Sequence, residues 1–438
     1  MLNLVKKIIA LDNPARLFYH YLRAVVANLI NWNPWSKNIK IIWVTWTNWK
    51  TTTTNIIAKS LQDAWKKVFM YSTVNYILDW KEEVNHSKMT SPDVFVIQNL
   101  LRQAVNAWAE YAVIETSSHS ILMHRNYWIQ YDVAVLTNIS QDHLDLHRTM
   151  KNYIETKLRL FKDLIWNVRK KWVKKTAIIN WDIKEAELFL EETYDKEYTY
   201  GLNDWCWLRA TNVKYLFDKT TFEVKIPWDT LHIETPLRWK FNVYNILAAI
   251  SVLLDDTVNP RMIEKSIKNV LWVPWRMEEI PNNIWAKIYV DYAHTEDALE
   301  QVLQTVWDIE GIKRVITVFW ATWDRDKTKR PGMWEIVSEY SNLVILTQDD
   351  DYSEDTIEII KDVMPWINRK QWDDFYVIPD RKDAIRQALL IAKKWDVVLL
   401  AWKWAEQSMI TNEWVIEWSD KDVVLEILKD LDDNKIIN

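Results

Sequence analysis

Hydrophobic and polar positions along this chain of 438 residues form blocks that predict alternating strands and helices. Residues 39–45 are rich in β-branched side chains and predict a short strand, and residues 51–67 directly after it have the pattern of a helix. Apolar, strand-like runs recur at 111–114, 133–137 and 177–180, with helical stretches between them. This order is typical of an α/β domain with a largely parallel sheet.

The pattern changes over residues 198–236. Thr, Val and Ile alternate with polar residues at 222–226 and 231–235, which predicts a small antiparallel insertion. A second alternating block begins near Arg276 and predicts a Rossmann-like domain without a dinucleotide fingerprint. Its expected strands are 286–291, 315–319, 343–347, 375–378 and 397–401. The chain therefore divides into a helical extension at 1–38, a central domain at 39–273 and a C-terminal domain at 274–438.

The first of these segments contains a mostly apolar stretch, residues 17–30, that is interrupted by His20 and Arg23. It is too short to span a bilayer. We favour a helix packed on the next domain, and a weak contact with a membrane surface stays open. Residues 1–11 lack the small-residue cleavage site of a secretory signal.

Charge and cysteine content limit the function classes. The formal net charge is −6 with a pI near 5.9, so nothing in the charge favours nucleic acid as a partner. A single cysteine, Cys206, excludes an internal disulfide framework and fits a reducing cytoplasm. We expect a cytoplasmic protein, and a monomer.

Thirty tryptophans stand against three glycines, although an ordinary domain carries about 7% glycine. The stretch Trp43-Val44-Thr45-Trp46-Thr47-Asn48-Trp49-Lys50-Thr51-Thr52 becomes a phosphate-binding loop when each Trp is replaced by Gly. Indole rings at these positions would fill the phosphate site, whereas glycine lets the backbone approach it closely. Some bacterial lineages use the UGA codon for glycine. We therefore hypothesise that most of the printed tryptophans are glycines in the working protein.

The loop follows a predicted strand and opens a predicted helix, which is the context that a phosphate-binding loop requires. In such a loop Lys50 would reach the β- and γ-phosphates of a nucleotide, and Thr51 or Thr52 would bind Mg²⁺. Trp46, Thr47, Asn48 and Trp49 would supply backbone contacts.

Two acidic motifs follow later strands of the same domain. Glu115 comes directly after the run 111–114, and Asp142-His143 follows the run 133–137. The carboxyl ends of parallel strands are where α/β sheets place ligands. A carboxylate and an imidazole beside a phosphate loop can hold a second Mg²⁺. Taken alone, each could instead be a capping or core polar residue.

At this point the chain resembles the Mur ligases, and within them the type that adds the third residue of the peptidoglycan stem peptide. The resemblance covers residues 38 to the C-terminus, and at least twelve tryptophans fall where the family has glycine. Its motifs are the loop 46–52, Thr90-Ser91-Pro92, Glu115-Thr116-Ser117-Ser118-His119, Thr137-Asn138 with Asp142-His143-Leu144-Asp145, Lys157, Phe241-Asn242-Val243-Tyr244-Asn245, Trp272-Val273-Pro274-Trp275-Arg276, Asp291-Tyr292-Ala293-His294-Thr295, Asp324-Arg325-Asp326-Lys327-Thr328-Lys329-Arg330 and Lys403-Trp404-Ala405-Glu406.

The resemblance implies roles for these residues. Lys157 matches a carbamylated lysine that holds the second metal together with Glu115 and His143, while Thr51 holds the first. These three residues and Lys50 are the implied catalytic set. The implied ATP contacts are Trp46, Thr47, Asn48, Trp49, Lys50, Thr51, Thr52, Asn242, Asn245, Arg276, Asp291 and Arg325. The implied substrate contacts are Thr90, Ser91, Thr116, Ser117, Asp349, Asp350, Tyr352 and Glu406.

The activity implied by the resemblance is ATP-dependent amide formation on UDP-N-acetylmuramoyl-dipeptide through an acyl phosphate, with two Mg²⁺ ions. Its partners are small molecules, namely the UDP-muramyl-peptide and an amino acid. Two alternatives stay open: a folylpolyglutamate-synthase-like ligase that uses another carrier, and an ATP-binding partner subunit without catalysis.

Three departures from the family pattern limit these expectations. The phosphate loop begins near residue 43, so the domain that usually holds the UDP end is missing or shrunk to a helix. Asp349-Asp350-Asp351-Tyr352 replaces an Asp-Asn-Pro-Arg motif, and tyrosine cannot supply the cationic fork that grips the distal carboxylate of meso-diaminopimelate. A diamino acid without that carboxylate, such as lysine or ornithine, is therefore expected. Ala405 stands where the family has histidine.

Overall fold

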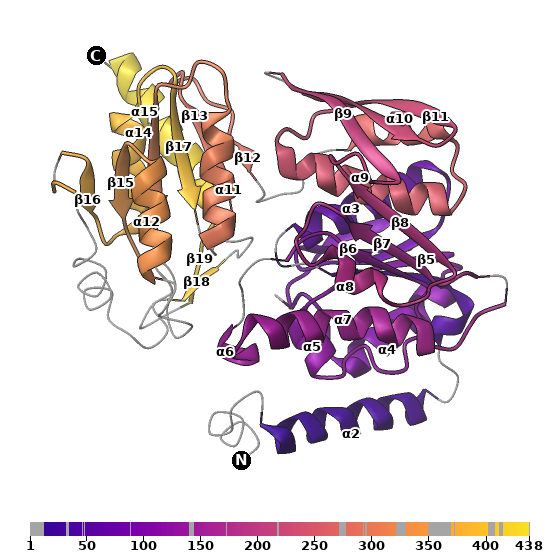
Figure 1. The fold of residues 1–438 in the computed structure, drawn as a ribbon. Helices are drawn as coiled ribbons and strands as arrows, with labels where there is room; N and C mark the ends of the chain where they lie inside the picture. Colours follow the sequence, from indigo (N-terminus) through magenta and orange to yellow (C-terminus); the bar gives the residue numbers. More distant parts are fainter. Residues whose placement is uncertain are drawn as a thin grey trace. The chain divides into compact units, whose positions relative to one another are not determined.

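The computed structural model describes residues 13–31, 35–45, 47, 49–87, 89–139, 144–171, 173–216, 219–270, 277–291, 293, 296–320, 330–348, 369–371, 373–401, 408–410 and 415–437. The chain forms two compact units, Met1–Leu271 and Trp272–Asn438. Each is described by itself (Figure 1).

The first unit is built on an eleven-stranded sheet in the order β11-β10-β9-β8-β7-β6-β1-β5-β2-β3-β4. Its strands are β1 (Lys40–Thr45), β2 (Val68–Tyr71), β3 (Asn75–Leu78), β4 (Lys81–Val84), β5 (Tyr111–Thr116), β6 (Val133–Leu136), β7 (Thr176–Asn180), β8 (Lys196–Gly201), β9 (Leu208–Tyr215), β10 (Thr220–Ile226) and β11 (Asp229–Thr235). From β2 across to β9 neighbouring strands are parallel, so their carboxyl ends share one edge.

Helices cover this sheet on both faces, as a buried parallel sheet requires. They are α2 (Pro14–Ile30), η1 (Trp35–Asn38), α3 (Lys50–Asp63), α4 (Val94–Asn106), α5 (Ser118–Leu122), α6 (Leu144–His147), α7 (Met150–Trp166), α8 (Ala186–Leu190), α9 (Lys240–Asp255) and α10 (Pro260–Asn269). Figure 1 shows α3 and α9 on one side of the sheet, and α4, α5, α7 and α8 on the other.

The core of this unit lies where the sheet meets α4 and α7. Leu101 of α4 and Phe161 of α7 are fully buried there, against apolar side chains of β1, β5 and β6. Each of these helices begins at a polar cap: Asp93 accepts from Phe95 N, and Thr149 accepts from Asn152 N. This packing fixes the carboxyl ends of the strands beside α3. These ends form the edge of the sheet where the sequence predicts the catalytic residues.

The second unit holds a six-stranded sheet in the order β12-β13-β17-β14-β15-β16. Its strands are β12 (Glu278–Glu279), β13 (Lys287–Asp291), β14 (Arg314–Phe319), β15 (Leu343–Leu346), β16 (Phe375–Val377) and β17 (Asp396–Ala401), with a separate hairpin of β18 (Ser408–Ile410) and β19 (Val415–Glu417). Its helices are α11 (Glu296–Trp307), α12 (Arg330–Tyr340), α14 (Arg381–Ile391) and α15 (Asp420–Ile437). β13 to β16 pair in parallel, and a buried ion pair between Arg381 and Asp420 links α14 to α15.

The α/β class and the positions of the predicted strands are confirmed. The small antiparallel part is also confirmed: β9, β10 and β11 pair antiparallel and continue the same sheet as β1. The hairpin β3–β4 was not predicted, since each strand has only four residues and β4 is exposed.

Backbone geometry bears on the tryptophans. Fourteen described non-glycine residues have positive φ, a region that L side chains rarely adopt, and eight of them are tryptophan. These are Trp49, Trp65, Trp80, Trp108, Trp128, Trp239, Trp285 and Trp395. Glycine is the residue that enters this region without steric cost. The distribution supports the hypothesis that these positions carry glycine.

Within the part of the chain that the structure describes, no helix is both long enough and apolar enough to cross a membrane.

Candidate active site

The phosphate loop lies between β1 and α3. β1 ends at Thr45 and α3 begins at Lys50, so the first backbone N–H groups of a helix of fourteen residues point at the loop. Lys50 Nζ donates to the carbonyl of Thr47 at 3.0 Å. Trp46 and Asn48, two further predicted loop residues, lie outside the described residues. The observed strand–loop–helix is the local structure that nucleotide phosphates require.

Trp49 precedes this helix in the left-handed region, with φ of 70°. Its ring is buried and stacks on Phe241 of α9, with centroids 3.7 Å apart and planes inclined by 9°. Since Asn242 is the next residue along α9, the indole fills space between the phosphate loop and the predicted nucleotide contacts. Glycine at position 49 would leave that space open.

Glu115 lies inside β5, near its carboxyl end, and not after the strand as predicted. Its Oε2 accepts three hydrogen bonds, from Thr51 Oγ1 at 3.0 Å, Thr73 N at 2.7 Å and Thr73 Oγ1 at 2.8 Å. The residue is 2% exposed. Hydrogen bonds to an ionised acceptor are strong, so this carboxylate is held firmly beside the first turn of α3.

Lys157 of α7 is fully buried, so it is not a solvent-exposed lysine on the helix surface. Its Nζ donates to Thr47 Oγ1 at 3.3 Å and lies 4.6 Å from the centre of the Tyr153 ring. Tyr153 Oη is itself 2.9 Å from Thr47 Oγ1. Burial of an ammonium group in such a place carries a desolvation cost.

Four of the predicted substrate residues lie along the same edge of the sheet. Thr90 Oγ1 accepts from Thr73 Oγ1 at 3.1 Å, and Ser91 Oγ donates to the carbonyl of Glu115 at 3.2 Å. Ser117 N donates to Ser91 Oγ at 3.2 Å, and Thr116 ends β5. The structure therefore brings these four residues together with Glu115.

Asn242 and Asn245 lie one turn apart on α9 and are buried. Asn245 Oδ1 accepts from Thr53 Oγ1 of α3 at 3.1 Å, and its Nδ2 donates to Asn242 Oδ1 at 3.0 Å. The pair fixes the start of α9 against the helix that opens the phosphate loop.

Several buried hydroxyls at this edge have no hydrogen-bond partner among the described residues. They are the Oγ1 atoms of Thr45, Thr52, Thr116 and Thr137. Three of them stand at or just after the carboxyl ends of β1, β5 and β6, and Thr52 is in the first turn of α3. An unmet buried hydroxyl costs free energy, so a row of them at a strand edge suits a polar ligand or its water shell.

Other predicted residues fall elsewhere. Asp291 ends β13 in the second unit, where its buried carboxylate accepts from Met277 N at 2.7 Å. The remaining predicted residues, His143, Arg276, Arg325, Asp349, Asp350, Tyr352 and Glu406, lie outside the described residues. Among the residues that are described, no group of three or more His, Cys, Asp or Glu could hold a metal ion.

Three residues of this edge were not predicted from the sequence. Thr73 comes just after β2, and Glu115 lies near the carboxyl end of the neighbouring strand β5, so the expectation that ligands lie at the carboxyl ends of strands could have identified Thr73. Tyr153 lies four residues before Lys157, on the same face of α7. Arg125 donates to the carbonyl of Ser91 at 2.9 Å, and burial lowers its pKa below the usual value. No sequence signal marked Arg125.

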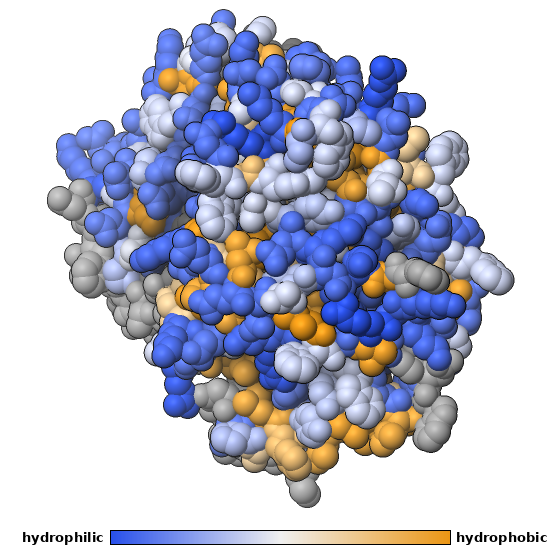
Figure 2. All heavy atoms as spheres, turned by 45° about the vertical axis from the view of Figure 1, so that its right-hand side comes forward, coloured by the Kyte–Doolittle hydropathy of each residue, from blue (hydrophilic) through white to orange (hydrophobic). Residues whose placement is uncertain are grey.

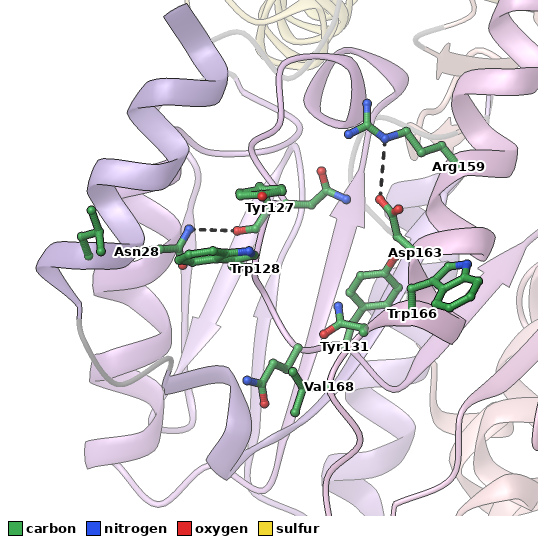
Figure 3. Close-up of a pocket in the computed structure, with 12 residues that line it drawn as sticks. Asn28, Tyr127, Trp128, Tyr131, Arg159, Asp163, Trp166 and Val168 are labelled. Atoms are coloured by element: carbon green, nitrogen blue, oxygen red, sulfur yellow. Dashed lines mark hydrogen bonds and ion pairs between the residues drawn. The ribbon is translucent and has the colours of Figure 1, made fainter. Parts of the chain in front are cut away.

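A separate cavity of about 590 Å³ lies between α2, α7 and the segment that precedes β6 (Figure 3). Asn28 Nδ2 donates to the carbonyl of Tyr127 there at 3.1 Å, and Arg159 pairs with Asp163. Its wall includes Trp128, which has positive φ and falls under the glycine hypothesis. The cavity is part of the packing of α2 and not of the strand edge.

Two protein-family patterns match the chain. One is the Mur ligase middle domain, over residues 44–253, and the other is the Mur ligase glutamate ligase domain, over residues 275–401. The boundary between them falls beside the division between the two compact units.

Relatives match over nearly the whole chain. A protein of Clostridium acetobutylicum named UDP-N-acetylmuramoyl-L-alanyl-D-glutamate–2,6-diaminopimelate ligase 1 is 36% identical over 402 residues, covering 91% of this chain and 80% of the relative. A ligase of the same type from Syntrophomonas wolfei is 35% identical over 395 residues, covering 90% of this chain and 79% of the relative.

Solved structures have the same fold. A UDP-N-acetylmuramoyl-L-alanyl-D-glutamate–2,6-diaminopimelate ligase matches with a TM-score of 0.62 at 28% identity, over 90% of this chain and 79% of that one. A folylpolyglutamate synthase of Mycobacterium tuberculosis matches with a TM-score of 0.67 over 87% of this chain and 92% of that one. The second match is 14% identical and shows the fold alone.

Proposed function

The chain belongs to the Mur ligase family. From that premise we propose that it uses ATP to join an amino acid to UDP-N-acetylmuramoyl-L-alanyl-D-glutamate, the compound that its relatives' names give as their substrate. Enzymes of this family are ATP-dependent ligases. One observation carries the proposal for this chain: Glu115 and the buried Lys157 both contact the phosphate-loop segment, through Thr51 and Thr47.

Members of the family bind ATP and Mg²⁺, and the described residues fit both. Thr51 Oγ1 and the Glu115 carboxylate are neighbouring hard oxygen donors, the kind that Mg²⁺ prefers. Lys50 and the N-terminus of α3 suit the charge of a triphosphate. When bound, the metal would neutralise charge on the transferred phosphoryl group. We propose Thr51 for one ion, and Glu115, His143 and Lys157 for a second.

The proposed reaction has two steps. A carboxylate oxygen of the substrate attacks the γ-phosphorus of ATP, the bond to ADP breaks, and an acyl phosphate forms. The nitrogen of the incoming amino acid then attacks the acyl carbon, phosphate leaves, and the nitrogen loses a proton to give the amide. The protein's part is to hold the reacting atoms in line and to stabilise the developing charge.

Within this scheme Lys50 would hold the phosphates, while Thr73 keeps the carboxylate of Glu115 in place. Asn242 and Asn245 of α9 are proposed nucleotide contacts, and so are Arg276, Asp291 and Arg325. Thr90, Ser91, Thr116, Ser117 and the partly buried Arg125 would line the path of the carrier peptide.

We propose that Lys157 carries a carbamate. An unmodified ammonium next to Mg²⁺ would repel it, whereas a carbamate adds an anionic oxygen ligand. Lys157 is fully buried and its Nζ lies 3.3 Å from Thr47 Oγ1 of the phosphate loop, so a carbamate on it would lie beside the proposed metal site. Thr47 and the Tyr153 ring would remain its neighbours.

The incoming amino acid is proposed to be a diamino acid. The relatives' names specify 2,6-diaminopimelate, while Tyr352 favours one without a distal carboxylate. Asp349, Asp350 and Glu406 would meet its cationic end. Because ATP and UDP-sugars are cytoplasmic metabolites, the cytoplasm is the proposed place of work, and a monomer is the proposed state.

The test is phosphate release by the protein with glycine at the motif tryptophans, supplied with Mg-ATP and UDP-N-acetylmuramoyl-Ala-Glu, with and without L-lysine or meso-diaminopimelate. Release that needs both dipeptide and amino acid is expected. Release with a folate and glutamate instead would favour the folylpolyglutamate-synthase-like alternative. ATP binding without release for any pair would favour the non-catalytic partner subunit.

A further inference from the structure

Helix α2 packs on the first unit through its small and polar residues. Ala24 and Ala27 are fully buried against Val94 at the start of α4. Between them and α4, Asn28 accepts from Gln98 Nε2 at 3.0 Å, and Arg23 pairs with Asp93 at 3.1 Å. These contacts fix the rotation of the helix about its axis.

The face turned away from the protein carries the large apolar side chains. Its members are Phe18, Tyr19, Leu22, Val26, Leu29 and Ile30, with exposed fractions from 41% to 70%. At about 100° per residue, these positions and Ala15 fall within an arc of about 120° on the helix surface. In Figure 2 apolar residues gather at the lower edge of the molecule, where Figure 1 shows α2.

A helix that covers a core normally turns this arc inward. In this protein the apolar arc of α2 faces outward, and the contacts of Asn28 and Arg23 hold the helix in that orientation. Contiguous apolar patches of this kind on a protein surface mark a contact site. The outward face of α2 is therefore built to meet something apolar.

Charge identifies the occupant. α2 contains no acidic residue, and Arg16 and Arg23 lie along one margin of the apolar arc. In the sequence, Lys6 and Lys7 stand among apolar residues just before the helix. An apolar stripe bordered by arginine is the pattern of a helix that lies in the interface of an anionic membrane, with its cations at the headgroups.

We propose that α2 lies flat on an anionic lipid bilayer, with the arc from Phe18 to Ile30 among the acyl chains and Arg16 at the headgroups, while Arg23 keeps its ion pair with Asp93. If two copies of this chain met through this face, their arginines would lie close together and repel each other, which disfavours self-association. The contact holds the enzyme at the membrane surface and uses no residue of the strand edge.

The experiment is sedimentation of the full chain with vesicles, without ATP or substrate, so that its outcome is separate from that of the proposed ligase activity. One set contains phosphatidylglycerol with phosphatidylethanolamine, and the other contains phosphatidylcholine alone. We expect binding to the anionic set at least tenfold tighter than to the neutral set, and weakened by salt.

The deciding variant is L22Q with L29Q, which removes apolar contact without adding charge. Leu22 and Leu29 are 44% and 53% exposed, so the change should leave folding intact. The matched control is L188Q with L390Q, at leucines 39% and 57% exposed on α8 and α14. We expect a tenfold loss of binding for the first pair and none for the second, with unchanged circular dichroism for both.

Three results would overturn the proposal. One is absence of wild-type binding to anionic vesicles, and another is equal binding by the L22Q/L29Q variant. The third is a dimer in analytical ultracentrifugation that this variant dissociates, since the face would then belong to a second copy of the chain.

Discussion

The ring of Trp49 lies parallel to the ring of Phe241, 3.7 Å away between centroids, and so joins the residue before α3 to the start of α9. Both partners are buried. Position 49 also has φ of 70°, which a tryptophan adopts only under strain. The stacked rings therefore fill the space between the phosphate loop and the asparagines of α9. The backbone at position 49 has a conformation suited to glycine.

Glycine at position 49 is expected to restore nucleotide binding. The W49G variant of the printed sequence should bind Mg-ATP at least tenfold more tightly, because the indole no longer fills the space beside Lys50. Isothermal titration calorimetry measures the affinity of each variant for Mg-ATP. The matched control is W205G, at an 85% exposed position without positive φ, which should change nothing. Tandem mass spectrometry of the protein from its own cells would test the assignment directly, and tryptophan at position 49 there would refute it.

Substitution of Lys157 by alanine is expected to abolish ligation, lowering kcat by at least about 100-fold, because the proposed carbamate would be lost from the second metal site. Phosphate release measures the effect. The control is K151A, a lysine of the same helix whose side chain is 84% exposed. Intact mass spectrometry in bicarbonate should show one added CO₂ on the wild type and none on K157A. Full activity of K157A would contradict the proposed role.

The sequence predicted which strands and which loop form the edge of the sheet at the candidate site. It predicted the side-chain contacts between these elements less well. Strand runs and the loop 46–52 carry local patterns, so their places could be foreseen. The contact between Lys157 and Thr47 joins residues 110 apart, and only the fold brings them together. α2 packs on α4 of the central domain, as we favoured, but the sequence did not predict that its small residues Ala24 and Ala27 would face α4 while its large apolar side chains face outward.

Thr73 is expected to position Glu115. T73V keeps the backbone donor but removes the Oγ1 donor at 2.8 Å from the carboxylate. A hydrogen bond to a charged group contributes about 1.5–3 kcal/mol, so kcat should fall about 10- to 100-fold, with little change in KM for ATP. The control is T220V, a buried threonine of β10 whose hydroxyl has no partner among the described residues. An unchanged kcat for T73V would remove Thr73 from the site.

The stability of the first unit should fall in mild acid because of His124. Burial, and then the charge of Arg159, lower the pKa of His124 to about 4, and its Nδ1 lies 3.0 Å from Arg159 Nη2. The unfolded chain takes up a proton near pH 6.5 and the folded chain does not, so stability is lost as the pH falls from about 6.5 to about 4. Since the side chain is only partly buried, we expect a loss of about 1–2 kcal/mol.

Urea unfolding at pH 7 and pH 4.5 measures this loss, and H124Q should flatten it. Identical pH profiles for H124Q and the wild type would show that His124 is not responsible.

The choice of amino acid tests the reasoning about Tyr352. Relatives at 36% and 35% identity carry names that specify 2,6-diaminopimelate, but a tyrosine cannot form the bidentate pair that an arginine makes with the distal carboxylate. We therefore expect a higher kcat/KM for L-lysine or ornithine than for meso-diaminopimelate. Y352R should shift the preference toward meso-diaminopimelate, because it supplies a cationic fork. A wild type that prefers meso-diaminopimelate would show that other residues grip the carboxylate, and Y352R would then have little effect.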